Sequence, residues 1–352
     1  MQDLEQPTLA SELRALAWAA ILVPVCMVYA RSASRRLRPG RPRLAALFPT
    51  FPVFIYLPWM FNSLHLRLFS TFFHTWLATN KLVLLALGLG PLNPSLPLLP
   101  FLLCAGLPIK LRVDGHNHPT KQSSSSPVAD FLVPCARSFL FLTCLAVLHP
   151  HTGSLPLYVL HYLYCAQIFL TYDLVFSSVG LVAAAALGTG MERSFRAPLV
   201  VASVNDFWGR QWNLMAVDLL RESAYIPVRA RWGRDAGVLA AFLMSGLLHE
   251  LLYWYMTLER PTGEMLLFFT LHAAFHVAER WARVAGLWRP PKVAAYVLVT
   301  AFMVVTISEF FFGPFIRAGI DVCMMQESAA AVELVRAVAK RLIIRPFGPV
   351  SS

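Results

Sequence analysis

Long apolar segments constrain this chain more than any other feature of its sequence. About twenty consecutive, predominantly apolar residues are enough for a helix to cross the hydrocarbon core of a bilayer. Such segments cover residues 15–30, 44–61, 68–88, 92–109, 131–148, 155–172, 174–187, 236–256, 265–284 and 293–315. Only 14% of the residues are charged, too few to coat a soluble protein that is 57% hydrophobic. The sequence therefore predicts an all-α, polytopic membrane protein with about eight or nine transmembrane helices.

The formal net charge of +11 is explained by the same architecture rather than by nucleic-acid binding. Most of the basic residues lie in short stretches between apolar segments, as in loops that flank membrane spans. An arginine cluster in residues 31–43 follows the first apolar segment, and acidic residues precede that segment. This order differs from a cleaved signal peptide, which begins with a basic region. We expect an uncleaved first helix with residues 31–43 on the cytosolic side.

The chain is predicted to form a single membrane-embedded domain over residues 1–352. Residues 110–129 include a polar run and predict an exposed loop, and residues 330–352 predict an amphipathic tail at the membrane interface. His74 and Lys81 interrupt an apolar segment, so part of that segment is expected to line a cavity or lie at the interface. We find no internal repeat, which argues against a transporter built from inverted halves.

An aromatic and polar motif occupies residues 205–213, with the sequence Asn-Asp-Phe-Trp-Gly-Arg-Gln-Trp-Asn. One interpretation is an interfacial aromatic belt with an Asp206–Arg210 ion pair, because tryptophan favours the headgroup region. A belt does not require an amide, however, so it leaves the asparagine at each end of the motif unexplained. The alternative interpretation is a functional site.

A second motif places Ser245, Gly246, His249 and Glu250 in the middle of an apolar segment. Ionisable side chains at this depth are costly unless they face protein or water, so the His–Glu pair indicates a functional site. Ser245 and Gly246 share a helix face with His249 and are predicted to leave a gap beside the imidazole. A buried histidine that is hydrogen-bonded to a neighbouring helix is the structural alternative.

The sequence indicates no metal site. His272 and His276 are spaced by one helical turn, but no third ligand follows a recognisable spacing, which favours packing or cavity lining. His249 and Glu250 do not continue into a zinc-binding HExxH motif, because the last position is Tyr253. The chain also lacks GxSxG, P-loop and GxGxxG motifs.

With these motifs the sequence resembles the membrane-bound O-acyltransferase superfamily, in particular its plant wax-synthase-like branch. The resemblance rests on NDFWGRQWNL from Asn205, SGLLHELL from Ser245 and FFTLHAAFHVAE from Phe268. WLATNKLVLLALGLGPLNPSL from Trp76 and LPIK from Leu107 are similar to that branch as well. Gln211 is a departure, since plant members usually carry a second arginine there, and we expect it to tune substrate contacts.

The resemblance implies a multi-helix fold around an intramembrane reaction chamber in the endoplasmic reticulum membrane. It implies His249 as the catalytic histidine and Asn213 as its partner. It also implies acyl-CoA as a co-substrate with no further cofactor, a lipid alcohol as acceptor, and contacts with membrane lipids. Further residues are predicted to contact substrate within the same motifs: Asp206, Trp208, Arg210, Gln211, Trp212, Ser245, Glu250 and His272.

The residue types suit this chemistry. The thioester carbonyl is already electrophilic and CoA thiolate leaves readily, so deprotonating the alcohol is the demanding step. A positioned histidine with an ordinary pKa of about 6.5 can act as the general base, and Asn213 can donate an amide N–H to the oxyanion or to the donor. Soluble and glycerolipid acyltransferases instead use histidine with aspartate four or five positions later, and none of the ten histidines here has that partner.

The leading hypothesis is therefore esterification of a long-chain fatty alcohol to a wax ester. Esterification of a sterol is the first alternative, and a non-catalytic lipid transporter or lipid-binding membrane protein is the second. Arg210 and the cluster of Arg229, Arg231 and Arg234 are placed to attract the phosphates of CoA. The same arginines could instead mark only a cytosolic loop.

Overall fold

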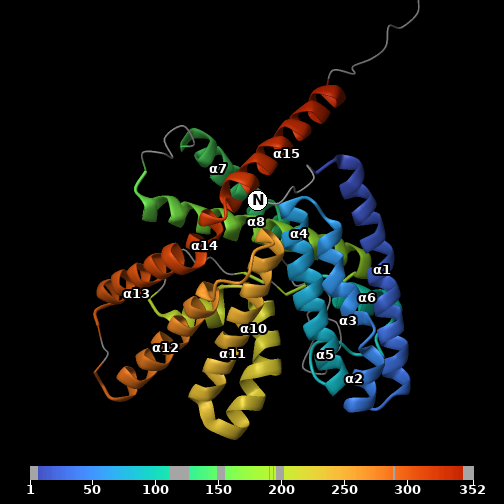
Figure 1. Ribbon diagram of the computed structural model, residues 1–352, viewed down its shortest axis with the longest axis horizontal. Coiled ribbons are helices and arrows are strands. Elements are labelled where there is room, and N and C mark those ends of the chain that lie inside the picture. The colour runs from blue at the N-terminus through green and yellow to red at the C-terminus, as the bar shows by residue number, and fades with distance from the viewer. Residues whose placement is uncertain are drawn as a thin grey trace, which may run out of the picture.

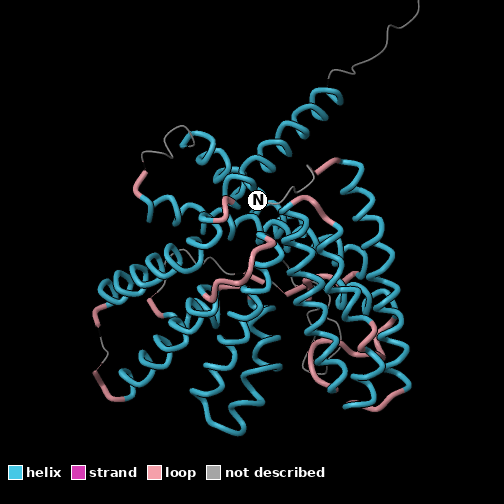
Figure 2. Tube along the Cα trace, in the orientation of Figure 1, coloured by secondary structure: helices cyan, strands magenta, loops and turns pink. Residues whose placement is uncertain are grey.

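A computed structural model describes residues 7–110, 127–148, 155–189, 191–192, 194–195, 202–287 and 290–343. Within these ranges the regular elements are helices, and Figure 2 shows them joined by loops of varying length. The prediction of an all-helical protein is thus confirmed for the part of the chain that the structure describes. Residues 111–126, which hold most of the predicted polar loop, lie outside the described ranges, as do residues 344–352 of the predicted tail.

The N-terminal part forms one group of helices around a common apolar core (Figure 1). Met27, Phe54, Leu82 and Phe101 are fully or almost fully buried in this core. The helices of the group are α1 (Leu9–Arg36), α2 (Arg41–Leu47), α3 (Thr50–Tyr56), η1 (Leu57–Met60), α4 (Leu64–Ser70), η2 (Thr71–Ala78), α5 (Thr79–Leu87) and α6 (Leu98–Gly106).

The remaining helices form a second group. Among its contacts with the first group, α8 contacts α6, α11 contacts α4 and η2, and α15 contacts α4. This group contains α7 (Pro127–Leu148), α8 (Leu157–Leu187), α9 (Val204–Asp206), η4 (Phe207–Gln211), α10 (Leu214–Leu220), η5 (Arg221–Tyr225), α11 (Ile226–Thr257), α12 (Glu264–Val284), α13 (Lys292–Thr306), η6 (Ile307–Phe312), α14 (Gly313–Arg317) and α15 (Ile320–Ile343). The elements η2, η4, η5 and η6 are π-helical.

Helix α11 contains a sharp bend at Gly233, whose φ of 87° favours glycine. A Cβ atom at Gly237 would lie only 2.9 Å from the carbonyl oxygen of Tyr225. In a straight helix these two positions would be about 18 Å apart. The chain therefore turns back at Gly233, and Figure 1 shows this bend at the same end of the molecule as α2.

Four helical stretches within the described residues are long and apolar enough to cross a membrane, or five if the bent pair Arg41–Leu47 and Thr50–Met60 is one span. The four are Leu9–Arg36, Leu157–Leu187, Leu214–Thr257 and Lys292–Arg317. This finding supports a polytopic membrane protein, although it does not confirm eight or nine spans. The prediction of separate helices at residues 155–172 and 174–187 is wrong, because α8 continues without a break through both.

Three basic side chains in or directly beside the apolar segments are buried and bind backbone carbonyl groups. Lys81 is 1% exposed, and its Nζ donates 2.7 Å hydrogen bonds to the carbonyl oxygens of Cys104 and Leu107 at the end of α6. Arg43 and Arg67 bind carbonyl groups in the same way. Lys81 is therefore a residue of the buried core rather than of the interface. Unpaired carbonyl groups at a helix end require donors, and Lys81 supplies two inside the core.

Replacing Lys81 with methionine, which keeps the length of the side chain, is expected to destabilise the protein by about 3 kcal/mol. The variant lacks two charge-assisted hydrogen bonds of about 1.5 kcal/mol each. Thermal unfolding of the detergent-solubilised protein should shift to lower temperature, whereas Lys292→Met at an exposed position should leave it unchanged. An unchanged midpoint for Lys81→Met would contradict the capping role.

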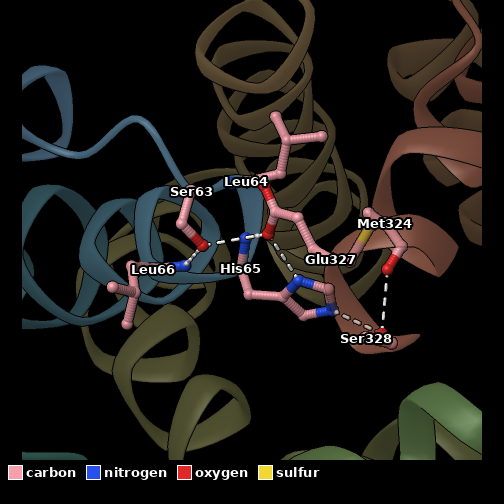
Figure 3. A network of polar contacts seen from close by, with 7 residues as sticks. All are labelled: Ser63, Leu64, His65, Leu66, Met324, Glu327 and Ser328. Carbon is pink, nitrogen blue, oxygen red and sulfur yellow. Dashed lines mark hydrogen bonds and ion pairs between the residues drawn. The ribbon is translucent and has the colours of Figure 1, made fainter. Parts of the chain in front are cut away.

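The carboxylate of Glu327 on α15 binds the N-terminal end of α4 and so links the two helices (Figure 3). Glu327 Oε1 accepts from the backbone N–H of Leu64 at 2.7 Å, and Oε2 accepts from Ser63 Oγ at 2.9 Å and from His65 Nδ1 at 2.8 Å. Burial raises the pKa of the Glu327 carboxyl, but these hydrogen bonds outweigh burial and bring the pKa below its usual range. A negative charge here is favourable because α4 presents its free N–H groups to it.

Candidate active site

An apolar cavity of about 140 Å³ lies between α8, α11, α12, α13 and η6. Its volume is far larger than the 10–15 Å³ or so that one water molecule needs, so it can accept part of a lipid chain. The imidazole of His249 lines the cavity. The other lining residues are predominantly aromatic or aliphatic: His161, Tyr162, Cys165, Ala166, Ile168, Phe169, Phe207, Trp208, Trp212, Phe268, Phe269, Thr300, Met303, Val304, Ile307, Ser308, Phe311 and Phe312.

The imidazole of His249 is held in one tautomer by its own helix. Its Nδ1 lies 2.7 Å from the carbonyl oxygen of Ser245, and a carbonyl oxygen can only accept, so Nδ1 carries a proton. The neutral ring then has its lone pair on Nε2. The ring also packs against Phe269, with 4.5 Å between the ring centroids. The hydrogen bond of His249 therefore goes to its own helix, unlike that of the structural alternative, and does not involve the Nε2 lone pair.

Gly246 and Glu250 hold α11 against α12 rather than shaping a space beside the imidazole. A Cβ atom at Gly246 would lie 2.9 Å from Leu266 Cα, so only glycine permits this close approach. Glu250 is buried, and its Oε1 accepts from the backbone N–H of Leu266 at 3.0 Å, in the first turn of α12. The predicted gap is thus filled by α12 at Gly246, whereas Ser245 and His249 each line a cavity.

Trp208 is fixed by a directional chain of hydrogen bonds. Its Nε1–H donates to His272 Nδ1 at 2.9 Å, so the proton of the neutral His272 ring is on Nε2. His272 Nε2 lies 2.9 Å from Thr306 Oγ1, which in turn donates to the carbonyl oxygen of Phe302 at 2.8 Å. His272 is fully buried and is not among the cavity-lining residues. Its contacts therefore position Trp208 on the cavity wall.

The other side chains of the aromatic motif divide between the cavity and the surface. Trp212 lines the cavity and stacks on Phe207 at a centroid distance of 5.7 Å. Asp206 pairs with Arg210 at 3.7 Å and accepts from Gln211 Nε2 at 2.5 Å. The Arg210 side chain is 75% exposed. The motif is therefore more than an aromatic belt, since its two tryptophans line the cavity.

Asn213 is the N-cap residue of α10 and adopts a left-handed conformation, with φ of 37° and ψ of 66°. Asparagine tolerates this conformation better than most residues. Its Oδ1 accepts from the backbone N–H of Ala216 at 3.2 Å, so any donation to substrate must come from Nδ2. Asn213 is buried and is not among the residues that line the cavity of His249.

A second cavity, of about 290 Å³, lies on the other side of Trp208 and Phe269, which line both cavities. Arg221 and Arg234 line it, together with Ser245. The full set is Asn205, Trp208, Gly209, Val217, Leu220, Arg221, Tyr225, Arg234, Val238, Ala241, Phe242, Ser245, Phe269 and His276. Sequence reasoning missed Arg221, which has no distinguishing pattern around it.

The second cavity contains Asn205 of the aromatic motif and one arginine of the predicted cluster. In the second cavity His276 Nε2 lies 2.8 Å from Asn205 Oδ1, so the asparagine at the start of the motif acts as an acceptor. Arg229 lies over the ring of Tyr225 at 5.7 Å, and Arg231 lies over Trp232 at 5.5 Å. Neither arginine lines the cavity. Of the predicted arginine cluster, the structure brings only Arg234 to the cavity wall.

Known proteins share the aromatic motif, the His249 motif and most of the second cavity. Residues 191–271 match the membrane bound O-acyl transferase family. The chain is 33% identical to "Probable long-chain-alcohol O-fatty-acyltransferase 1" of Arabidopsis thaliana over 329 residues, which cover 91% of this chain and 95% of that relative. The chain belongs to the membrane-bound O-acyl transferase family.

The chain is also similar in sequence to two relatives whose names give different acceptors. Long-chain-alcohol O-fatty-acyltransferase of Simmondsia chinensis is 34% identical over 300 residues, covering 82% of this chain and 85% of the relative. Acyl-CoA–sterol O-acyltransferase 1 of Arabidopsis thaliana is 30% identical over 338 residues, covering 91% of this chain and 96% of the relative. Both names describe O-acylation. The matched family region includes His249, Asn213 and most of the second cavity.

Proposed function

We propose that this protein transfers a fatty acyl group from acyl-CoA to the hydroxyl group of a long-chain alcohol and thereby forms a wax ester. The observation that carries the proposal is a histidine with a free Nε2 lone pair on the wall of an apolar cavity. Relatives that are similar over most of the chain and are named for alcohol acylation support the same reaction. We propose acyl-CoA as co-substrate without a further cofactor.

In the proposed mechanism His249 Nε2 accepts the proton of the alcohol as its oxygen attacks the thioester carbonyl carbon. The tetrahedral intermediate then collapses, the carbon–sulfur bond breaks, and the imidazolium returns the proton to the leaving thiolate. The products are the ester and CoA. Asn213 Nδ2 is proposed to donate to the developing oxyanion. The apolar walls exclude water, which would otherwise hydrolyse the thioester.

The second cavity is the proposed approach of the acyl donor, because Arg221 and Arg234 line it. Arginine binds phosphate groups through charge-assisted hydrogen bonds. Trp208 and Phe269 border both cavities, so a donor with its CoA moiety near the arginines could reach His249 past these two rings. The same arrangement supports a cytosolic position for this end of the molecule, since acyl-CoA is cytosolic.

A double variant Arg221→Gln/Arg234→Gln is expected to raise the KM for acyl-CoA about tenfold and leave the KM for the alcohol unchanged. The two guanidinium groups are expected to bind the phosphates of CoA, whereas the alcohol carries no charged group for them to bind. Steady-state kinetics with each substrate varied in turn measure both constants. The matched control is Arg229→Gln/Arg231→Gln, whose side chains rest on aromatic rings. Equal effects of both double variants on acyl-CoA would assign the role to net charge rather than to the cavity.

Sterol acylation is the second candidate, because one relative is named for that reaction. A non-catalytic lipid transporter or lipid-binding protein is the candidate from another class. Expression in yeast that lacks its own neutral-lipid acyltransferases, followed by ester profiling with and without fed fatty alcohol, separates the three. Wax esters that depend on the fed alcohol support the proposal, sterol esters support the second candidate, and no ester supports the third.

We also propose an endoplasmic reticulum location and eight or nine membrane spans. The apolar helices and the family support a multi-pass membrane protein. Co-localisation of a tagged, active protein with a marker of that membrane tests the location.

A further inference from the structure

Two polar side chains of the first cavity have no hydrogen-bond partner among the residues that the structure describes. His161 on α8 is 3% exposed, and neither of its ring nitrogens is paired. Ser308 on η6 is also 3% exposed, and its Oγ is unpaired. Both side chains line the cavity that contains His249. A buried polar atom without a partner costs free energy, so these groups point to a ligand that they bind.

The His161 ring is held by packing, which leaves its nitrogens available. Its centroid lies 5.5 Å from that of Phe312. Phe311 contacts both Phe312, at 5.6 Å, and His249, at 5.9 Å, so a row of rings connects the two histidines along the cavity. The π-helical η6 carries both phenylalanines and Ser308. Such π-helical turns are frequent at functional sites.

The reaction offers few groups for these side chains to bind. The proposed position of the CoA moiety is beside the arginines of the second cavity, and the fatty acyl chain has no polar atoms. The thioester carbonyl has to lie against His249 for the chemistry to occur. The remaining polar group is the hydroxyl of the lipid acceptor. A hydroxyl can donate to an imidazole nitrogen and accept from a serine hydroxyl at the same time.

We propose that His161 and Ser308 form a hydroxyl-binding site that receives the lipid alcohol before its oxygen reaches His249, an inference that rests on the proposed acyltransferase function. An alcohol that enters the apolar cavity loses its hydrogen bonds to water or headgroups. The site replaces those hydrogen bonds, whereas an alkane of the same length gains nothing from it. The cavity thereby selects hydroxylated lipids.

The test compares the binding of hexadecanol and of hexadecane to the purified full-length protein in detergent, by displacement of radiolabelled hexadecanol. The wild-type protein should prefer the alcohol. His161→Phe retains a ring against Phe312 but removes both nitrogens. We expect it to weaken hexadecanol binding about three- to tenfold, the range for one hydrogen bond, and to leave hexadecane binding unchanged. In turnover assays the KM for hexadecanol should rise by a similar factor, without a loss of kcat and with the KM for acyl-CoA unchanged.

Three companion variants make the result specific. His161→Gln restores a donor and an acceptor and should recover part of the preference. Ser308→Ala is a smaller change that should also reduce it, and it serves as the test if His161→Phe fails to accumulate. Val159→Ala, at an exposed position of the same helix, should change nothing.

The outcomes also separate this inference from the proposed function. An unchanged preference in His161→Phe and Ser308→Ala, or an equal loss of alcohol and alkane binding, overturns the hydroxyl site. If the wild-type protein forms no ester from any fed alcohol, the proposed function fails instead, whatever the binding preference. A wild-type protein that makes esters together with an alcohol-specific KM increase in His161→Phe supports both.

Discussion

The His249→Ala variant is expected to form ester about 10²–10⁴-fold more slowly than the wild-type protein, the range for loss of a positioned general base. It should accumulate in the membrane to a normal level, because the hydrogen bond of His249 goes to Ser245 on the same helix and its loss breaks no polar contact between helices. Rates of ester formation, normalised to the amount of monodisperse protein, measure the effect.

Leu247→Ala is the matched control, since Leu247 lies on the same helix with 55% of its surface exposed and does not line either cavity. It should retain the wild-type rate. Near-normal turnover in a well-folded His249→Ala protein would remove His249 from the role of general base. The proposed mechanism would then lack its proton acceptor.

Asn213 requires two substitutions, because it has a structural and a proposed chemical role. Asn213→Asp keeps an N-cap oxygen for Ala216 but removes the Nδ2 donor. We expect it to lower kcat about 10²–10³-fold, as for the loss of one oxyanion donor, with little change in thermal stability. Asn213→Ala should show a similar loss of kcat and a further destabilisation of about 1 kcal/mol from the missing cap.

A different pattern would reassign this residue. If Asn213→Asp retained normal kcat while Asn213→Ala lost activity in proportion to its stability, Asn213 would act as a helix cap alone. If only the KM for acyl-CoA changed, its contact would belong to binding of the donor rather than to the transition state. Unfolding curves and full kinetics on both variants distinguish these cases.

The membrane character of the protein follows directly from its apolar segments, because a helix is the element that satisfies its own backbone in hydrocarbon. The breaks between helices are less readable. The polar residues around Asp173 suggest an end between two spans, but α8 passes through them as one helix. Gly233 produces a reversal within what otherwise resembles a continuous helix. Local sequence therefore predicts that a segment lies in the membrane better than it predicts where its helices begin, end or bend.

The site shows the same limit at the level of side chains. His249 can be selected from the sequence because an ionisable group at that depth is costly and therefore needs a purpose. The adjacent Glu250 carries the same signal, yet its carboxylate caps the backbone of α12. Successive residues of a helix point in different directions, so only the position of α12 decides which of the two faces the cavity.

Lys81 and His161 show what depends on tertiary structure alone. Both are polar residues in apolar segments, and nothing in their neighbours distinguishes them. Lys81 donates hydrogen bonds to two carbonyl oxygens at the end of α6, whereas His161 packs against an aromatic ring and lines a cavity. The sequence indicates that each of these polar groups needs a hydrogen-bond partner, because burying it without one is costly. Which group compensates it is decided by the packing of helices that are distant in sequence.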